Sequence, residues 1–191
     1  MNLPYPIFAF LFLVGAIVSV LALRNNNQTM IGLRAAVYEA DKTGVGVEEA
    51  LDKLRVYVYG HMNTNLASGG NAIKPPIQLK FTYERLKAAE EARAGAENEK
   101  IYTDAQEYCQ AKIPASVSGS ARVPCVADYV SSHGVKVKEI PAGLYQFDFL
   151  SPSWSPDLVG WSLVVSTLAV ALTITSFIRQ SKISIISSTS L

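Results

Sequence analysis

The chain has 191 residues, a formal net charge of +1 and 49% hydrophobic residues, so one ordinary domain could account for its length. Charge is distributed very unevenly, because all 16 acidic residues and 14 of the 17 Lys and Arg lie between Asn25 and Asp157. That segment has a net charge near −2 and no basic patch, which excludes the charge pattern of a nucleic-acid-binding surface.

Residues 3–23 carry no charged side chain and are mostly apolar. At about 1.5 Å per helical residue, they can cross the roughly 30 Å hydrocarbon layer of a bilayer. The small residues around Ala22 would also fit a cleaved signal peptide. However, the first residues, MNLPYPIF, lack the basic residue of a signal, and the apolar run is longer than a signal requires. We therefore predict an uncleaved transmembrane helix over residues 1–24.

The next segments have the apolar periodicity of helices. Residues 28–44, QTMIGLRAAVYEADKTG, and residues 47–66, VEEALDKLRVYVYGHMNTNL, place apolar side chains at three- and four-residue spacing. The intervening GVG predicts an antiparallel helical hairpin. The Gly and Pro content of residues 67–76 predicts a loop.

Residues 77–113 contain no proline and are rich in Ala, Glu, Lys and Leu, which predicts one long helix or two helices joined near Gly95. A shorter helix is expected from Pro124 to Gly134. Residues 135–140, VKVKEI, alternate like a strand, although an extended segment is the alternative. With an aromatic and proline-rich linker up to Asp157, the segment 25–157 is predicted to be a mainly helical domain.

Leu158–Ile178 is a second uncharged apolar stretch, of 21 residues, and is predicted to be a second transmembrane helix. Two buried helices of a soluble protein are the alternative interpretation. About 130 remaining residues could hardly enclose two helices that are apolar on every face, so we favour two spans.

Charges beside the second span predict the orientation in the membrane. Asp157 precedes the span, whereas Arg179 and Lys182 follow it. The positive-inside rule therefore places residues 179–191 in the cytoplasm as a short tail, and the domain between the spans outside it. The amino terminus is then cytoplasmic as well, although Arg24, just outside the first span, argues mildly against this.

Both spans have small residues along one face, which let helix backbones approach closely. They could pack the two spans on each other or dock onto the helices of a partner. Trp154 and Trp161 are expected at the outer membrane interface, where an amphipathic indole is favoured. The small residues are Gly15, Ser19 and Ala22 in the first span and Ser162, Ser166, Ala169 and Thr173 in the second.

Cys109 and Cys125 are the only cysteines, and they lie near the end of the long helix and the start of the short one. Fifteen residues separate them, whereas a thiol redox centre usually has the compact CxxC spacing. Outside the cytoplasm, we expect a structural disulfide that contributes about 3 kcal/mol in the chain-entropy model. Two free buried thiols are the main alternative.

Catalytic and metal-binding patterns are not found. The two histidines, His61 and His133, are not close in sequence to either cysteine and match no compact zinc module. No nucleophile, phosphate-binding or dinucleotide motif occurs. We therefore expect no enzyme activity, no metal and no cofactor.

Four stretches have a familiar pattern: RNNNQTMIGLRAAVYEAD, HMNTNLASGGNAIKPPIQLKFTYERL, RVPCVADYVSSHG and FDFLSPSWSPDLVGWSL. Across most of its length, the chain resembles uncharacterised double-pass membrane proteins of small-genome bacteria. This resemblance implies a bacterial plasma membrane. It carries no known activity, so no functional residue is transferred with it.

The leading hypothesis is a non-enzymatic membrane protein whose outer domain binds another protein or an envelope component, as a subunit of a membrane complex. Self-association through the spans or the outer domain is included. The alternative is a ligand sensor that signals through a separate cytoplasmic partner. Four aromatic residues near the membrane could form the contact with a partner, or they could form only the belt at the membrane interface. They are Tyr145, Phe147, Phe149 and Trp154.

Overall fold

The computed structural model describes residues 5–67, 73–113, 117 and 119–189, with side chains described as far as Lys182. The described chain is mainly helical, as predicted. It forms two compact units, and each is described by itself: Met1–Ile77 with Phe147–Leu191, and Gln78–Gln146. The two ends of the segment 25–157 belong to the first unit and its middle to the second.

α1 (Tyr5–Thr43) is one helix of 39 residues that continues from the apolar segment into the first amphipathic segment. We had expected the helix to end near Arg24, and this is wrong. Three asparagines follow Arg24, and each costs a helix well under about 1 kcal/mol, far less than a proline would. The Asn26 side chain also has partners away from its own backbone, because Nδ2 donates to Met62 O at 3.3 Å.

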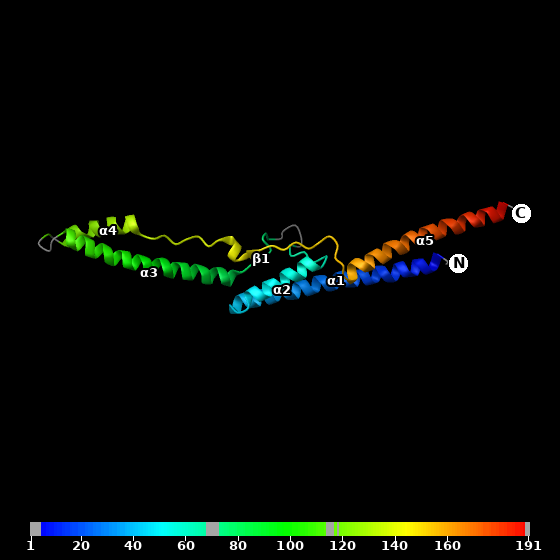
Figure 1. Cartoon of the computed structure of the whole chain (residues 1–191), viewed down its shortest axis with the longest axis horizontal. Coiled ribbons are helices and arrows are strands. Elements are labelled where there is room, and N and C mark those ends of the chain that lie inside the picture. Colours follow the sequence, from blue (N-terminus) through cyan, green and yellow to red (C-terminus); the bar gives the residue numbers. More distant parts are fainter. Residues whose placement is uncertain (1–4, 68–72, 114–116, 118, 190–191) are drawn as a thin grey trace. The chain divides into compact units, whose positions relative to one another are not determined.

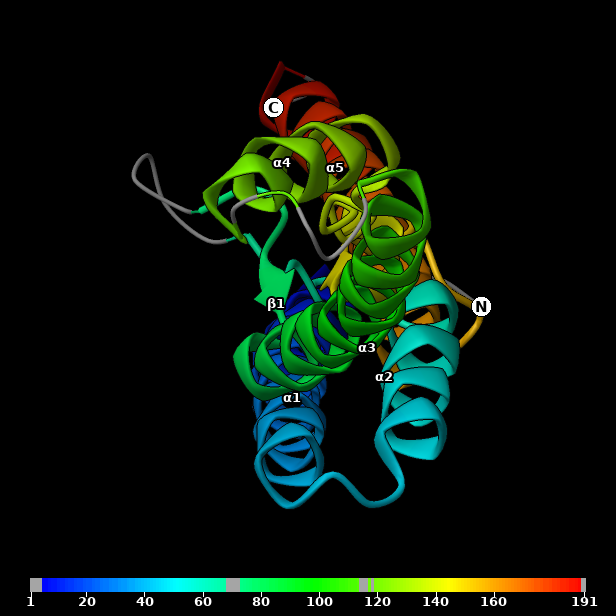
Figure 2. The same cartoon turned by 90° about the vertical axis from the view of Figure 1, so that its left-hand side faces the viewer.

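α2 (Val47–Gly60) folds back along α1, which confirms the predicted helical hairpin (Figure 2). Gly44 and Gly46 turn the chain with positive φ angles of 75° and 69°, a region that L side chains rarely adopt. α2 ends earlier than Leu66, where we had expected its end. Apolar side chains of both helices are buried between them: Met30, Val37, Leu51, Leu54 and Val58.

α5 (Leu158–Thr189) runs antiparallel to α1, and the start of α1 lies at the same end of the pair as the end of α5 (Figure 1). At that end the rings of Tyr5 and Phe177 meet edge to face, with their centroids 5.9 Å apart. By length and composition, both α1 and α5 could cross a bilayer. Two membrane-length helices were predicted, and the structure has both.

The second unit is built on α3 (Lys80–Lys112) and α4 (Arg122–His133), which lie side by side (Figure 1). α3 is a single helix, so the alternative break near Gly95 does not occur. α4 ends with Gly134 as its C-cap, as predicted. The N–H of Gly134 donates to Val130 O at 2.8 Å and completes the last turn of the helix.

Residues 135–140 form no strand, which corrects the expectation from their alternating pattern. A strand needs a neighbouring strand for its hydrogen bonds, and here α3 side chains take that place. Asn98 accepts the N–H of Val135 and donates to its carbonyl, both at 2.8 Å, and Glu90 accepts the N–H of Lys138 at 3.0 Å. The short strands β1 (Ile77–Gln78) and β2 (Gln146–Phe147) pair instead, where the chain passes between the units.

Candidate interaction sites

The small residues of the two apolar helices face each other. Ser19 Oγ and Ser162 Oγ are 2.8 Å apart, and both side chains are buried. Gly15 lies against Ser166, whose Cβ would be only 3.5 Å from a Cβ added at Gly15. Ala22 and Ala169 are buried as well, and Thr173 is half-buried and bonds to Ala169 O within α5. In this structure, therefore, these residues pack α1 on α5.

A polar cluster closes the end of the α1–α5 pair that is distant from Tyr5. Asn26 Nδ2 donates to Asp157 Oδ2 at 2.8 Å, and Asp157 Oδ1 accepts the N–H of Gly160 at 3.0 Å, capping α5. Ser155 is fully buried and accepts the N–H of Met62 at 3.0 Å. Sequence reasoning missed Asn26 and Ser155, because nothing in the local pattern tells a buried asparagine from its neighbours.

The surroundings of Asp157 favour the ionised form of its carboxyl group. Partial burial opposes ionisation of its carboxyl group, but the hydrogen bonds from Gly160 N–H, Asn26 and Ser155, together with nearby His61, outweigh burial and lower its pKa. A cavity of about 480 Å³ adjoins the cluster, and both Asp157 and His61 line it. His61 stacks on Tyr57, with ring centroids 4.1 Å apart.

The residues expected at the membrane interface lie near the two ends of α5. Trp154 and Trp161 are exposed and meet edge to face with centroids 6.3 Å apart. Arg179 and Lys182 are exposed near the other end of this helix. Phe149 of the linker does not lie on the surface. It is buried and its ring meets that of Tyr59, with centroids 6.1 Å apart, so it is not available to contact a partner.

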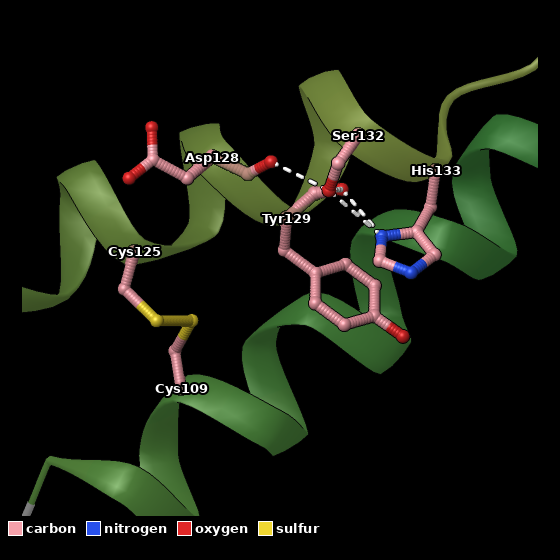
Figure 3. Close-up of a disulfide and its surroundings, with 6 residues drawn as sticks. All are labelled: Cys109, Cys125, Asp128, Tyr129, Ser132 and His133. Carbon is pink, nitrogen blue, oxygen red and sulfur yellow. Dashed lines mark hydrogen bonds between the residues drawn. A yellow bond between two sulfur atoms is a disulfide. The ribbon is translucent and has the colours of Figure 1, made fainter.

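The two cysteines join α3 to α4 (Figure 3). Their Sγ atoms lie at disulfide distance and their Cα atoms are 6.0 Å apart, so neither is a free thiol. Cys109 is fully buried near the end of α3, and Cys125 lies in the first turn of α4. On α4, the ring of Tyr129 stacks on that of His133 at 4.2 Å, as Figure 3 shows.

Next to the disulfide is a groove of about 670 Å³, which we call the α3–α4 groove. Arg122 is the only charged residue in its lining, and its Nε is buried without a hydrogen-bond partner among the described residues. A buried donor without an acceptor costs about 1–3 kcal/mol, so this feature requires an explanation. Other lining residues are Tyr102, Gln106, Cys109 and Gln110 of α3 and Val123, Val126, Ala127, Val130 and Ser131 of α4.

The part of the chain that the structure describes contains no group of three or more His, Cys, Asp or Glu side chains arranged to hold a metal ion. His133 is exposed, and its Nδ1 lies 3.0 Å from Tyr129 O at the end of α4. Comparisons with protein-family models, with curated proteins and with solved structures found no match. The candidate sites therefore depend on their geometry alone.

Proposed function

We propose that this is a non-enzymatic double-pass membrane protein. Its α3–α4 unit lies outside the plasma membrane and binds another protein or an envelope component. α1 and α5 cross the bilayer and anchor the unit, with both ends of the chain in the cytoplasm. The protein partner is a membrane-complex subunit or a second copy of this chain.

The proposed topology is supported by the antiparallel packing of α1 on α5. Two adjacent antiparallel spans put the start of α1 and the end of α5 on one side of a bilayer. The basic residues Arg179 and Lys182 favour the cytoplasm for that side. Asn26 and Asp157, at the other end of the pair, then lie at the outer interface, where water and headgroups tolerate an ionised carboxylate.

One observation carries the proposed interaction: the α3–α4 unit has almost no core of its own. α4 buries none of its side chains, and α3 buries only Ala94, Ala105 and Cys109. Apolar side chains remain exposed, and those of Val137 and Leu144 are each 52% exposed. A unit with so little buried apolar surface gains stability when a partner covers part of it.

In-membrane photo-cross-linking tests this proposal. A photoreactive amino acid at Val137 or Leu144 should cross-link a discrete protein in native membranes. The same probe at Lys136, an exposed charged position of the same segment, is the matched control and should cross-link far less. Equal, diffuse labelling at all three positions would contradict a specific partner.

Cysteine labelling tests the topology independently. Glu99→Cys in α3 and Gln180→Cys in α5 place single thiols at exposed positions. A membrane-impermeant maleimide added to intact cells should label the first and not the second. The opposite pattern would invert the proposed orientation.

A ligand sensor is the second candidate function. The α3–α4 groove favours it, because binding pockets for small molecules commonly measure about 300–1,000 Å³ and combine apolar walls with few polar groups. The groove has that size and carries one cationic residue, Arg122. A signal would then pass through the spans to a separate cytoplasmic protein.

A further inference from the structure

The α3–α4 groove has a cationic residue at one end and valine side chains along α4, with Gln106, Gln110 and Ser131 among its other lining residues. Arg122 is the first residue of α4, and the side chains of Val123, Val126 and Val130 follow along that helix. From Val123 to Val130 the helix rises about 10 Å, which is comparable to the length of an extended octanoate chain. Tyr102 of α3 contributes an aromatic side chain to the lining.

Arg122 identifies the kind of group that its end of the groove would bind. A guanidinium presents five N–H donors in a planar fork and has no acceptor, and a carboxylate matches it with two oxygens. The described groove provides no carboxylate of its own, because Arg122 is the only charged residue in its lining. Nε itself is buried without a partner among the described residues, so a ligand in the groove would meet the terminal N–H groups of the guanidinium.

We infer that the α3–α4 groove binds a small elongated carboxylate with an apolar body, such as a medium-chain fatty acid or an arylalkanoate. The carboxylate pairs with Arg122, and the apolar body lies along the valines of α4. This inference rests on the second candidate function, whose ligand class it names. It does not depend on the protein partner proposed above.

Calorimetric titration of the full chain in lipid nanodiscs tests the inference, with empty nanodiscs as the blank. The probes are octanoate, octylammonium and octan-1-ol, which share one chain length and differ in the head group. Octanoate should bind at least about tenfold more tightly than the other two, as expected for a charge-assisted pair. Equal binding of all three would overturn the inference, because it would mean simple partition into apolar surface.

Variants make the test specific to the groove. Arg122→Gln should weaken octanoate binding about tenfold or more, whereas Lys136→Gln removes an exposed charge outside the groove and should not change it. Ala127→Phe fills the groove and leaves Arg122 intact, so it should also weaken binding. An intact Cys109–Cys125 bond and an unchanged thermal midpoint show that a variant is folded, and unchanged octanoate affinity in both groove variants would refute the site.

The ligand class and the sensor function are refuted by different results. If octanoate does not bind, the ligand class is wrong while cross-linking at Leu144 is unaffected. A photoreactive amino acid at Gln180, near the end of α5, reports contacts with a cytoplasmic protein. If octanoate binds but changes the cross-links neither at Leu144 nor at Gln180, the groove is a binding site and the sensor role is refuted.

Discussion

Replacing Gly15 by alanine perturbs a close contact between α1 and α5. A Cβ at this position would collide with Ser166 Oγ, and it would lie 3.5 Å from Ser166 Cβ, an ordinary van der Waals distance. Ser166 Oγ donates to Ser162 O at 2.7 Å and cannot turn away without losing that bond. Either the hydrogen bond is lost or the helices move apart.

The expected cost follows from these two ways of relieving the collision. A side-chain hydrogen bond contributes about 0.5–1.5 kcal/mol to stability, and overpacking of a close contact costs about 1–3 kcal/mol. We therefore expect Gly15→Ala to lower the free energy of unfolding by about 1–2 kcal/mol. In a Ser166→Ala background the colliding oxygen is absent, so the substitution should be neutral. The coupling between the two positions is then about 1–2 kcal/mol.

Unfolding by SDS in a mild detergent, followed by tryptophan fluorescence, measures this coupling. Trp154 and Trp161 are the only tryptophans and report on the start of α5. Gly32→Ala in the same helix is the control, because nothing lies within 4 Å of the added Cβ, and it should raise stability by up to about 1 kcal/mol. If Gly15→Ala lowered stability equally in the wild-type protein and in the Ser166→Ala variant, the proposed contact would be refuted.

Three further outcomes are expected. Gly160→Ala should destabilise the protein by about 3 kcal/mol in the same SDS assay. The new Cβ would collide with the backbone oxygen of Ser155, which cannot rotate away. An unfolding midpoint equal to that of the wild type would contradict this. Cys109→Ser with Cys125→Ser should cost about 3 kcal/mol in thermal unfolding, and reduced wild-type protein should match the double variant. Since the pKa of Asp157 lies below its unfolded value, its stabilising contribution is present at neutral pH and is lost as pH falls below about 4. Asp157→Asn should therefore reduce the loss of stability at acid pH. If the free energy of unfolding fell with pH as steeply as in the wild type, other groups would be responsible for the acid dependence.

Local patterns predicted most elements because the forces behind them act within a few residues. Apolar spacing located the α1–α2 hairpin and its two-glycine turn, and the absence of proline located α3. Long uncharged stretches identified two helices that could cross a bilayer. Helix ends also put both cysteines at one bend, where the structure joins them.

Two of the errors of element assignment have a common cause, since both ignored partners that are distant in sequence. VKVKEI alternates like a strand, but its backbone bonds to Asn98 and Glu90 of α3. The asparagine run after Arg24 resembles a helix end, but Asn26 bonds to Asp157, 131 positions later. No local pattern contains that information.

The candidate site was missed for the same reason. Arg122 occurs in one of the stretches on which the resemblance is based, but a single arginine in a polar bend has no local signature. Only the packing of α4 on α3 places Arg122 in the lining of a groove with three valines and leaves its buried Nε without an acceptor among the described residues.

By itself, therefore, the sequence determined the helical composition, the two apolar helices and the position of the cysteines, because propensity, periodicity and hydrophobic length are properties of neighbouring residues. The tertiary structure alone decided which faces meet. It brought Gly15 to Ser166, Asn26 to Asp157 and Arg122 into the groove. Such pairings depend on the packing of whole helices, and that packing is set by contacts between residues far apart in the chain.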